Sequence, residues 1–207
     1  MKYSKLLILI ILILLVDQCL KIYIKTHFYY GQEVALLGSW FRLHFIENEG
    51  MAFGMKFGDA SIAKLVLTLF RLVAVGFGFY YLNVMIKKGF KNATLICAAL
   101  ILAGAFGNLI DSIFYGKLFS ESSFCLAQWV PWGKGYANLF YGRVVDMLYF
   151  PLVEWTLPSS TPFIGAYTIR FFEPVFNIAD ASISIGVLTL LFFQKRLLTL
   201  PKEVKTD

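Results

Sequence analysis

The sequence predicts an all-α membrane protein with four transmembrane helices, a small outer β-sheet and an aromatic-rich outer loop insertion. Three observations predict this fold. The chain of 207 residues is 58% hydrophobic and only 15% charged, whereas soluble domains average about 45–50% and about 25%. Its apolar residues gather in four long runs. Lysines and arginines flank alternate ends of those runs, as in membrane proteins of fixed orientation. We expect residues 1–207 to form a single integral membrane domain.

Each apolar run is about long enough to cross a bilayer as a helix, which takes about 20 residues. The expected spans are residues 6–24, 65–86, 93–114 and 175–193. The first run could also be the apolar core of a cleaved signal peptide, with Cys19 as a lipidated cysteine. However, Asp17 and Gln18 precede that cysteine, where cleavage requires small residues. We therefore interpret the first run as a retained helix.

The basic residues predict the orientation of the chain. Lys2 and Lys5 precede the first span, three lysines lie within 87–91, and more basic residues follow the fourth span. Such residues are enriched in short cytoplasmic segments. Both termini and the 87–91 link are therefore expected in the cytoplasm, and segments 25–64 and 115–174 are expected outside.

The two outer segments differ in character. Residues 39–57 partly alternate between polar and apolar side chains and contain glycine and asparagine turn signals, which favours short strands. The region 116–174 holds Trp129, Trp132 and Trp155, and tryptophan is typical of membrane–water interfaces. We expect this second segment to lie partly on the membrane surface.

The net charge of +6 does not indicate nucleic-acid binding. The basic residues lie at the ends of apolar runs and form no interleaved patch. The three cysteines and two histidines lack metal-ligand spacing and the HExxH pattern. We therefore expect neither a metal site nor a nucleic-acid partner.

Polar residues within the predicted spans share one depth. Given the expected orientation, they all lie towards the outer face, and the cytoplasmic halves of the spans stay apolar. Ionisable residues in spans are costly and usually face the bundle interior or a wet cavity. The residues concerned are Asp17, Lys21, Arg71, Asn108, Asp111, Asn177 and Asp180.

Spacing separates these residues into two kinds. Asp17 and Lys21 are four residues apart and can pair on one helix face, which favours a structural role in joining helices. Arg71 can likewise be a structural counter-ion or an interface anchor. Asp180, by contrast, has no cation at helical spacing on its own span. An unpaired carboxylate at this depth favours a functional role.

Asp146 is a second candidate for chemistry. It lies in the apolar stretch 144–148, outside the third span, where pairing with Arg143 is the alternative interpretation. Two carboxyl groups in a half-dry site can share a proton, so that one acts as base and the other as acid. That chemistry suits hydrolysis of a peptide bond.

The rival hypothesis is a small transporter with Asp17, Asp111 and Asp180 as a proton or ion relay. The apolar cytoplasmic halves and the lack of an inverted repeat weigh against it.

Five segments of the chain form a recognisable series: Asp17-Gln18 with Lys21, residues 47–54 (ENEGMAFG), 107–111 (GNLID), 144–146 (VVD) and 176–180 (FNIAD). In this order they resemble the lipoprotein signal peptidase (signal peptidase II) family, and together they extend over most of the chain. The resemblance implies an aspartic endopeptidase of the bacterial cell inner membrane, with no metal or organic cofactor. Its substrate would be a prolipoprotein whose cysteine carries diacylglycerol, cut just before that cysteine. It also implies a small outer sheet after the first helix and inhibition by globomycin-type cyclic peptides.

The resemblance implies a role for individual residues. Asp146 and Asp180 match the catalytic pair of the family. Its substrate-binding and site-shaping positions match Asn48, Gly50, Asn108 and Asn177. Its structural polar positions match Asp17, Lys21 and Asp111.

Two departures from the family pattern stand out. Ser112 occupies the place of an arginine that usually follows the Asp111 position, and Arg143 or Lys117 could supply a cation instead. The chain is also longer than is usual at residues 116–142 and 150–170, where the additions could form an outer lid or a partner surface.

Overall fold

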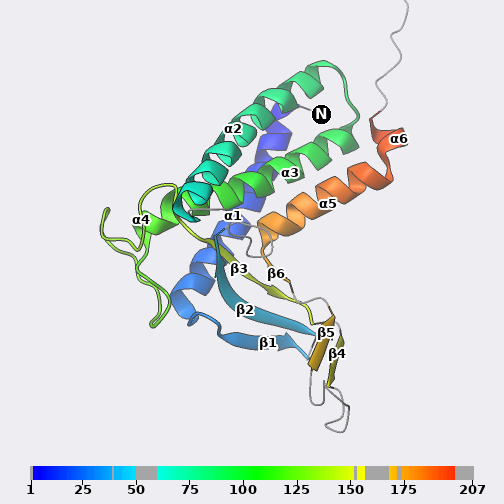
Figure 1. Ribbon diagram of the computed structural model, residues 1–207. Coiled ribbons are helices and arrows are strands. Elements are labelled where there is room, and N and C mark those ends of the chain that lie inside the picture. The colour runs from blue at the N-terminus through cyan, green and yellow to red at the C-terminus, as the bar shows by residue number, and fades with distance from the viewer. Residues whose placement is uncertain are drawn as a thin grey trace, which may run out of the picture.

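The computed structural model describes residues 2–38, 40–49, 60–151, 153–156, 168–171 and 174–198. A bundle of long helices stands on one end of a small antiparallel sheet (Figure 1). The long helices are α1 (Tyr3–His27), α2 (Ala60–Lys87), α3 (Asn92–Ile110) and α5 (Ile178–Phe192). Two short helices, α4 (Gly116–Leu118) and α6 (Gln194–Leu197), follow α3 and α5.

Three of the described helices are long and apolar enough to cross a membrane, at Tyr3–His27, Ser61–Lys87 and Asn92–Leu118. The expected fourth span at 175–193 is shorter than predicted. Its helix α5 has 15 residues, about 22 Å at about 1.5 Å per residue, whereas a hydrocarbon core is about 30 Å thick. Val175 and Phe176 join the sheet instead of the helix. The predicted number of spans is therefore confirmed for three helices and not for the fourth.

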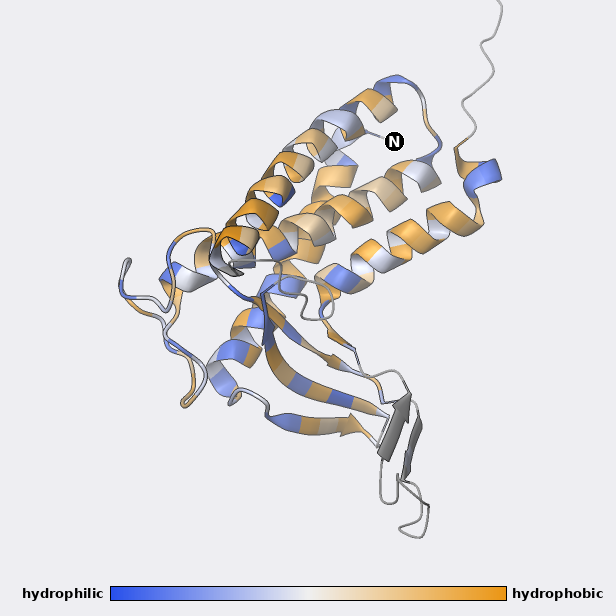
Figure 2. Ribbon diagram, viewed as in Figure 1, coloured by the Kyte–Doolittle hydropathy of each residue, from blue (hydrophilic) through white to orange (hydrophobic). Residues whose placement is uncertain are grey.

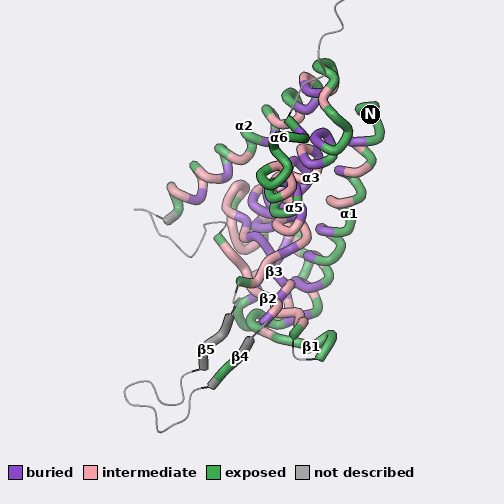
Figure 3. The backbone as a smooth tube through the Cα atoms, turned by 90° about the vertical axis from the view of Figure 1, so that its right-hand side faces the viewer, coloured by how far each residue is buried: buried purple, intermediate pink, exposed green. Residues whose placement is uncertain are grey.

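Helix α3 is the centre of the bundle and contacts α1, α2 and α5. Figure 2 shows all four long helices as predominantly hydrophobic, and Figure 3 shows large exposed parts of α1 and α2. Small residues bring α3 and α5 close together. A Cβ added to Gly104 would lie 2.1 Å from the carbonyl oxygen of Ala179, and one added to Gly186 would lie 2.8 Å from that of Cys97. This close crossing places the outer end of α3 beside the first turn of α5.

The outer end of α3 continues as a π-helical turn, Asp111–Tyr115, and then as α4. Such wide turns inside helices are frequent at functional sites. After α4, residues 119–143 form an outer loop that folds back on the helix end. In this loop the Gly142 amide donates to the Ser112 carbonyl oxygen at 2.9 Å.

The sheet has the strand order β1-β2-β3-β6, and every neighbouring pair is antiparallel. Its strands are β1 (Glu33–Leu37), β2 (Phe41–Asn48), β3 (Val144–Tyr149) and β6 (Val175–Phe176). The predicted small sheet is thus present, with β2 inside the expected strand region 39–57. Its position outside the membrane stays a prediction. A second pair, β4 (Val153–Thr156) and β5 (Thr168–Phe171), coincides with the extra segment 150–170 except for Phe171.

A buried apolar cluster joins the sheet to the bundle. It combines the end of α1, the middle of β2, the π-helical turn and β3 around Ile24, Phe45, Tyr115, Val145 and Met147. Burying such side chains contributes about 1.5–3 kcal/mol each relative to exposure. The cluster therefore fixes β3, and with it Asp146, against the ends of α1 and α3.

Candidate active site

The polar residues predicted from the sequence converge where the bundle meets the sheet. Figure 2 shows this as hydrophilic segments at the sheet end of otherwise hydrophobic helices. The structure brings together Asp17, Lys21, Asn48, Asn108, Asp111, Asp146, Asn177 and Asp180. Gly50 lies outside the described residues. The shared depth expected from the spans is therefore confirmed for α1, α3 and α5, and β3 adds Asp146 to the same place.

Asp146 lies on β3 with 1% of its surface exposed. Two asparagine amides donate to its carboxyl oxygens, Asn177 Nδ2 to Oδ1 at 2.7 Å and Asn48 Nδ2 to Oδ2 at 3.1 Å. Asn48 reaches it because β2 pairs with β3 so that Ile46 is opposite Asp146. The alternative pairing of Asp146 with Arg143 is wrong, because Arg143 binds glutamates of the outer loop and β2.

Asp180 lies in the first turn of α5 and is less buried than Asp146. It forms a capping box with Asn177. The backbone amide of Asp180 donates to Asn177 Oδ1 at 2.9 Å, and the backbone amide of Asn177 donates to Asp180 Oδ2 at 3.4 Å. Asn108 Nδ2 donates to the other carboxyl oxygen, Oδ1, at 2.8 Å. Arg71 of α2 adds an electrostatic attraction to Asp180.

The two carboxyl groups repel each other. Burial, and next the nearby charge of Asp180, raise the pKa of the Asp146 carboxyl from 3.8 to about 7. The hydrogen bonds from Asn48 and Asn177 act in the opposite direction and are outweighed. Below about pH 7, the Asp146 carboxyl therefore holds a proton.

A second group of charges, the Lys21 cluster, lies beside this pair and consists of Asp17, Lys21 and Asp111. The Lys21 ammonium lies 2.9 Å from Asp17 Oδ2 and 2.8 Å from Asp111 Oδ2, and it also donates to Asn108 Oδ1 at 2.9 Å. All three charged side chains are essentially inaccessible to solvent. The expected structural pairing of Asp17 with Lys21 is confirmed, and Asp111 joins it.

Asn108 connects the Lys21 cluster to Asp180. Its carbonyl oxygen accepts from Lys21 and, at 3.2 Å, from Asn177 Nδ2. An oxygen that faces two donors leaves the amide group of Asn108 to donate to Asp180. Lys21 therefore orients Asn108, which donates a hydrogen bond to the candidate catalytic residue Asp180.

Further bonds fix the Lys21 cluster to the backbone around it. Asp17 Oδ1 accepts from the Ala179 amide at 2.9 Å, one residue before Asp180. Gln18 Nε2 donates to Asp111 Oδ1 at 2.8 Å, and the Tyr115 hydroxyl donates to Gln18 Oε1 at 3.0 Å. Helix α1, the first turn of α5 and the π-helical turn are thus connected beside the candidate site.

The suggested substitutes for the arginine missing at Ser112 are engaged elsewhere. Arg143 contacts Glu121 at 2.8 Å and Glu47 at 3.1 Å, and these partners raise the pKa of its guanidinium. Lys117 donates to Asn138 Oδ1 at 2.9 Å. Either cation would have to exchange these partners to bind substrate.

Ser112 itself is fully buried and donates to the Asn108 carbonyl oxygen at 2.9 Å. It therefore closes the helix end behind Asn108 and does not extend into the site.

The sequence interpretation missed Lys25 and Lys64. Lys25 is buried on α1 and binds Glu47 and Ser122, and Lys64 of α2 donates to the Glu49 carbonyl oxygen at 2.7 Å. Both contacts hold the end of β2 on either side of Asn48. A signal for Lys25 was available, because it continues the four-residue spacing of Asp17 and Lys21 on one helix face.

Within the described ranges, no group of three or more histidine, cysteine, aspartate or glutamate side chains could hold a metal ion. The expectation of a metal-independent site stays a prediction. The arrangement itself offers two carboxyl groups, of which Asp146 is protonated below about pH 7, held by amide donors where the helices meet the sheet. That combination can transfer protons to and from a bound water and a peptide.

Known proteins resemble the chain over nearly its whole length. The family model for signal peptidase (SPase) II matches residues 9–195. The lipoprotein signal peptidase of Porphyromonas gingivalis is 50% identical over 193 residues, which cover 93% of this chain and 83% of that protein. The lipoprotein signal peptidase of Amoebophilus asiaticus is 37% identical over 189 residues, which cover 90% of this chain and 75% of that protein.

Two solved structures share the fold. Both are described as bacterial membrane enzymes determined by the in meso method, at 2.3 Å and 1.9 Å resolution. The first has a TM-score of 0.55 at 21% identity and covers 98% of this chain and 96% of its own. The second has a TM-score of 0.56 at 20% identity, with 94% of each chain covered.

Proposed function

This chain belongs to the signal peptidase II family, and we propose that it is an aspartic endopeptidase whose catalytic pair is Asp146 and Asp180. Family membership makes the chain a multi-pass bacterial membrane protease that removes signal peptides from prolipoproteins. The finer substrate in our proposal is a prolipoprotein whose cysteine carries diacylglycerol, cut just before that cysteine. The observation that carries the catalytic assignment is geometric: Asn177 donates to Asp146 and caps the turn that holds Asp180, so two carboxyl groups meet at one place. Burial, and next the charge of Asp180, raise the pKa of the Asp146 carboxyl.

The proposed reaction uses each carboxyl group once as acid and once as base. The ionised Asp180 takes a proton from water, whose oxygen bonds to the carbonyl carbon of the scissile peptide. Asp146 gives its proton to the carbonyl oxygen. When the tetrahedral intermediate collapses, the carbon–nitrogen bond breaks and Asp180 passes its proton to the leaving amine. Asp146 takes a proton back from the intermediate, which returns the pair to its starting state.

The assignment of Asp146 as first acid follows from its surroundings. It is the more buried of the two carboxyl groups, and burial disfavours its charged form. Asp180 is nearer to solvent and interacts electrostatically with Arg71, and we assign it as the first base. Asn48, Asn108 and Asn177 hold the pair and are proposed to contact substrate, with Gly50.

The lysine and arginine distribution supports a cytoplasmic position for both termini and the 87–91 link. The pair then lies near the outer face of the bacterial inner membrane, where a secreted prolipoprotein emerges. A cyclic peptide of the globomycin type would inhibit by occupying the same site.

The test is incubation of the purified protein with a diacylglyceryl-modified prolipoprotein. We expect cleavage at the bond directly before the lipidated cysteine, no cleavage of the unmodified precursor, and full activity in the presence of EDTA. Mass spectrometry of the products gives the position of the cut. Loss of activity on chelation with recovery on adding zinc would contradict the aspartic mechanism, and a cut elsewhere would contradict the substrate assignment.

A further inference from the structure

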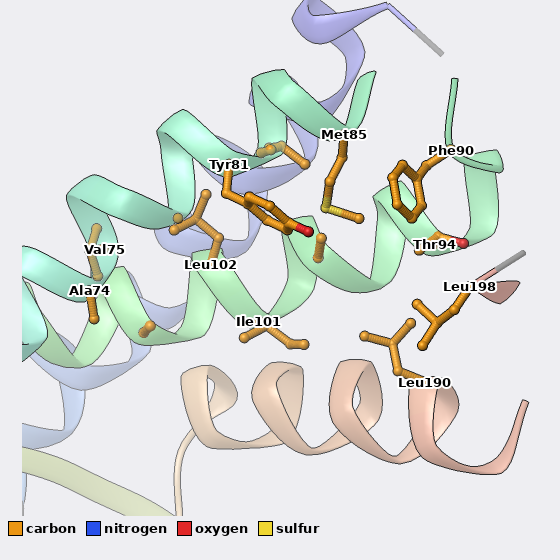
Figure 4. Close-up of a pocket in the computed structure, with 14 residues that line it drawn as sticks. Ala74, Val75, Tyr81, Met85, Phe90, Thr94, Ile101, Leu102, Leu190 and Leu198 are labelled. Atoms are coloured by element: carbon orange, nitrogen blue, oxygen red, sulfur yellow. The ribbon is translucent and has the colours of Figure 1, made fainter. Parts of the chain in front are cut away.

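A narrow cavity, open along part of its surface, lies between helices in the apolar part of the bundle, away from the candidate active site. Its volume is about 390 Å³, and α2 and α3 supply most of its lining. Figure 4 shows α2 and α5 on either side, with Ile101 and Leu102 of α3 between them. Phe90 and Leu198 line the end that lies next to the link between α2 and α3.

The lining is almost entirely hydrocarbon. Of the described lining residues, only Tyr81 and Thr94 have side-chain polar atoms. Thr94 already donates to the Leu197 carbonyl oxygen at 2.6 Å, so it requires nothing from an occupant. A ligand that fills this cavity must therefore be apolar along its length.

The shape of the cavity selects a single chain. It extends along α3 from Ala105 to Thr94, about 16 Å at about 1.5 Å per residue. Its volume then gives a mean cross-section of roughly 25 Å². An α-helix with side chains, about 10–12 Å across, needs about 80–110 Å². The cavity is thus too thin for the helix of a signal peptide and suits one extended acyl chain.

The outer end of the cavity adjoins the catalytic pair. Ala105 lines the cavity and lies three residues before Asn108, which donates to Asp180. One helical turn, about 5 Å, therefore separates the cavity from a residue that contacts the pair. A lipid attached next to the scissile bond would begin at this point.

We propose that this cavity binds one acyl chain of the diacylglyceryl group on the substrate cysteine. The proposal rests on the proposed function above. Moving a chain from bilayer to cavity has little hydrophobic driving force, since lipid tails are as apolar as leucine. The gain comes from the dispersion contacts that an unfilled cavity lacks. The cavity therefore distinguishes chain length, and the second acyl chain stays in the bilayer.

The first test compares substrates with different acyl chains. Lipopeptides of one sequence carry either dioctanoyl or dipalmitoyl glycerol, and kcat/KM is measured for both. We expect the wild-type protein to prefer the palmitoyl substrate by about tenfold. Ala98→Phe and the milder Ala98→Leu fill the cavity and should remove this preference while octanoyl cleavage stays unchanged. Ala93→Phe is the matched control, because Ala93 is exposed on α3 and outside the lining.

An unchanged chain-length preference in both Ala98 variants would overturn the proposal. The proposal would also be overturned if Ala98→Phe changed the melting temperature in nanodiscs but not the chain-length preference. Bilayer phospholipid, and not the substrate, would then occupy the cavity. Equal loss of preference in Ala93→Phe would also contradict it.

A second test does not depend on cleavage. A lipopeptide with a photoreactive group at the end of a palmitoyl chain should crosslink to the far end of the cavity, near Met85 and Thr94. Crosslinking without cleavage would contradict the proposed function and leave the cavity assignment standing. Cleavage without crosslinking at these positions would contradict the cavity assignment.

Discussion

The Lys21 cluster and the Asp146–Asp180 pair are joined through Asn108, yet they balance charge differently. In the cluster, one ammonium group lies within 2.9 Å of two carboxylates. The carboxyl groups of the pair accept hydrogen bonds from asparagine amides instead. A buried ion with partners of opposite charge is stable but inert, whereas two carboxyl groups held by neutral donors keep a proton that can move. Charge balance thus separates the supporting structure from the proposed chemistry.

The largest expected effect distinguishes the two regions by activity. Asp146→Asn and Asp180→Asn keep side-chain shape but remove the group that ionises. Each should lower cleavage by roughly 10²–10⁴-fold, the usual contribution of a general acid or base. The double variant should be little worse than either single one, because the two act as a unit.

The measurement for these variants is cleavage per folded protein, with folding checked by thermal unfolding in detergent. Asp17→Asn is the matched control from the Lys21 cluster, and its main effect should be on stability. Near wild-type cleavage by either dyad variant would show that the altered residue is not catalytic.

The second prediction distinguishes the two regions by stability. Lys21→Met removes the only ammonium group in the cluster and leaves Asp17 and Asp111 buried and unpaired. Breaking a buried ion pair in this way costs about 3–5 kcal/mol, so we expect a strong fall in melting temperature or in the yield of folded protein. The exposed Lys87→Met, at the other end of the bundle, should leave both unchanged. A melting temperature for Lys21→Met equal to the wild-type value would refute the structural role of the cluster.

The third prediction concerns Asn177, which belongs to both the helix cap and the pair. Asn177→Ser keeps a side-chain oxygen that can cap α5 but has no amide to donate to Asp146. It should lower kcat by roughly 10-fold, since a hydrogen bond between uncharged groups contributes about 0.5–1.5 kcal/mol and about 1.4 kcal/mol corresponds to a factor of ten. The cap on α5 is kept. Asn177→Ala should lose the same activity and a further 0.5–2 kcal/mol or so of stability. Equal stability of the two variants would argue against the capping role.

The fourth prediction gives the sign of the pH dependence. The pKa of the Asp146 carboxyl is raised to about 7, so the protonated form is present below that value and is lost as the pH rises through it. Because the proposed reaction needs this proton, kcat/KM should fall on the alkaline side of about pH 7. The measurement is the rate of cleavage as a function of pH. The stability of the protein is checked at each of the same pH values. A rate that keeps rising well above this range would contradict the assignment of Asp146 as acid.

Much of this arrangement could be predicted from the sequence, because helix geometry fixes the relation between nearby residues. The four-residue step from Asp17 to Lys21 and the three-residue steps ending at Asp111 and Asp180 place side chains on one helix face. The positive-inside rule then predicts their common depth. The same reasoning predicted a full membrane span at 175–193. The first two residues of that range form β6 and pair with β3, and α5 begins only at Ile178.

Contacts between distant segments could not be predicted in this way. Asn48 and Asp146 are 98 residues apart and meet through the register of β2 and β3, which shifts between Leu43 and Ile46. Likewise, Lys25 pairs with Glu47 because the sheet packs on the end of α1. Such partners depend on tertiary packing, which local periodicity does not contain.

The central claim, that Asp146 and Asp180 share one proton, can be measured directly by infrared spectroscopy of the carboxyl groups. Below about pH 7, the wild-type protein should show the absorption of a buried protonated carboxyl group, which disappears as the pH rises through that value. Asp146→Asn should abolish this absorption, and Asp17→Asn should leave it in place. If the absorption persists in Asp146→Asn and vanishes in Asp17→Asn, the proton belongs to the Lys21 cluster and the proposed catalytic pair is contradicted.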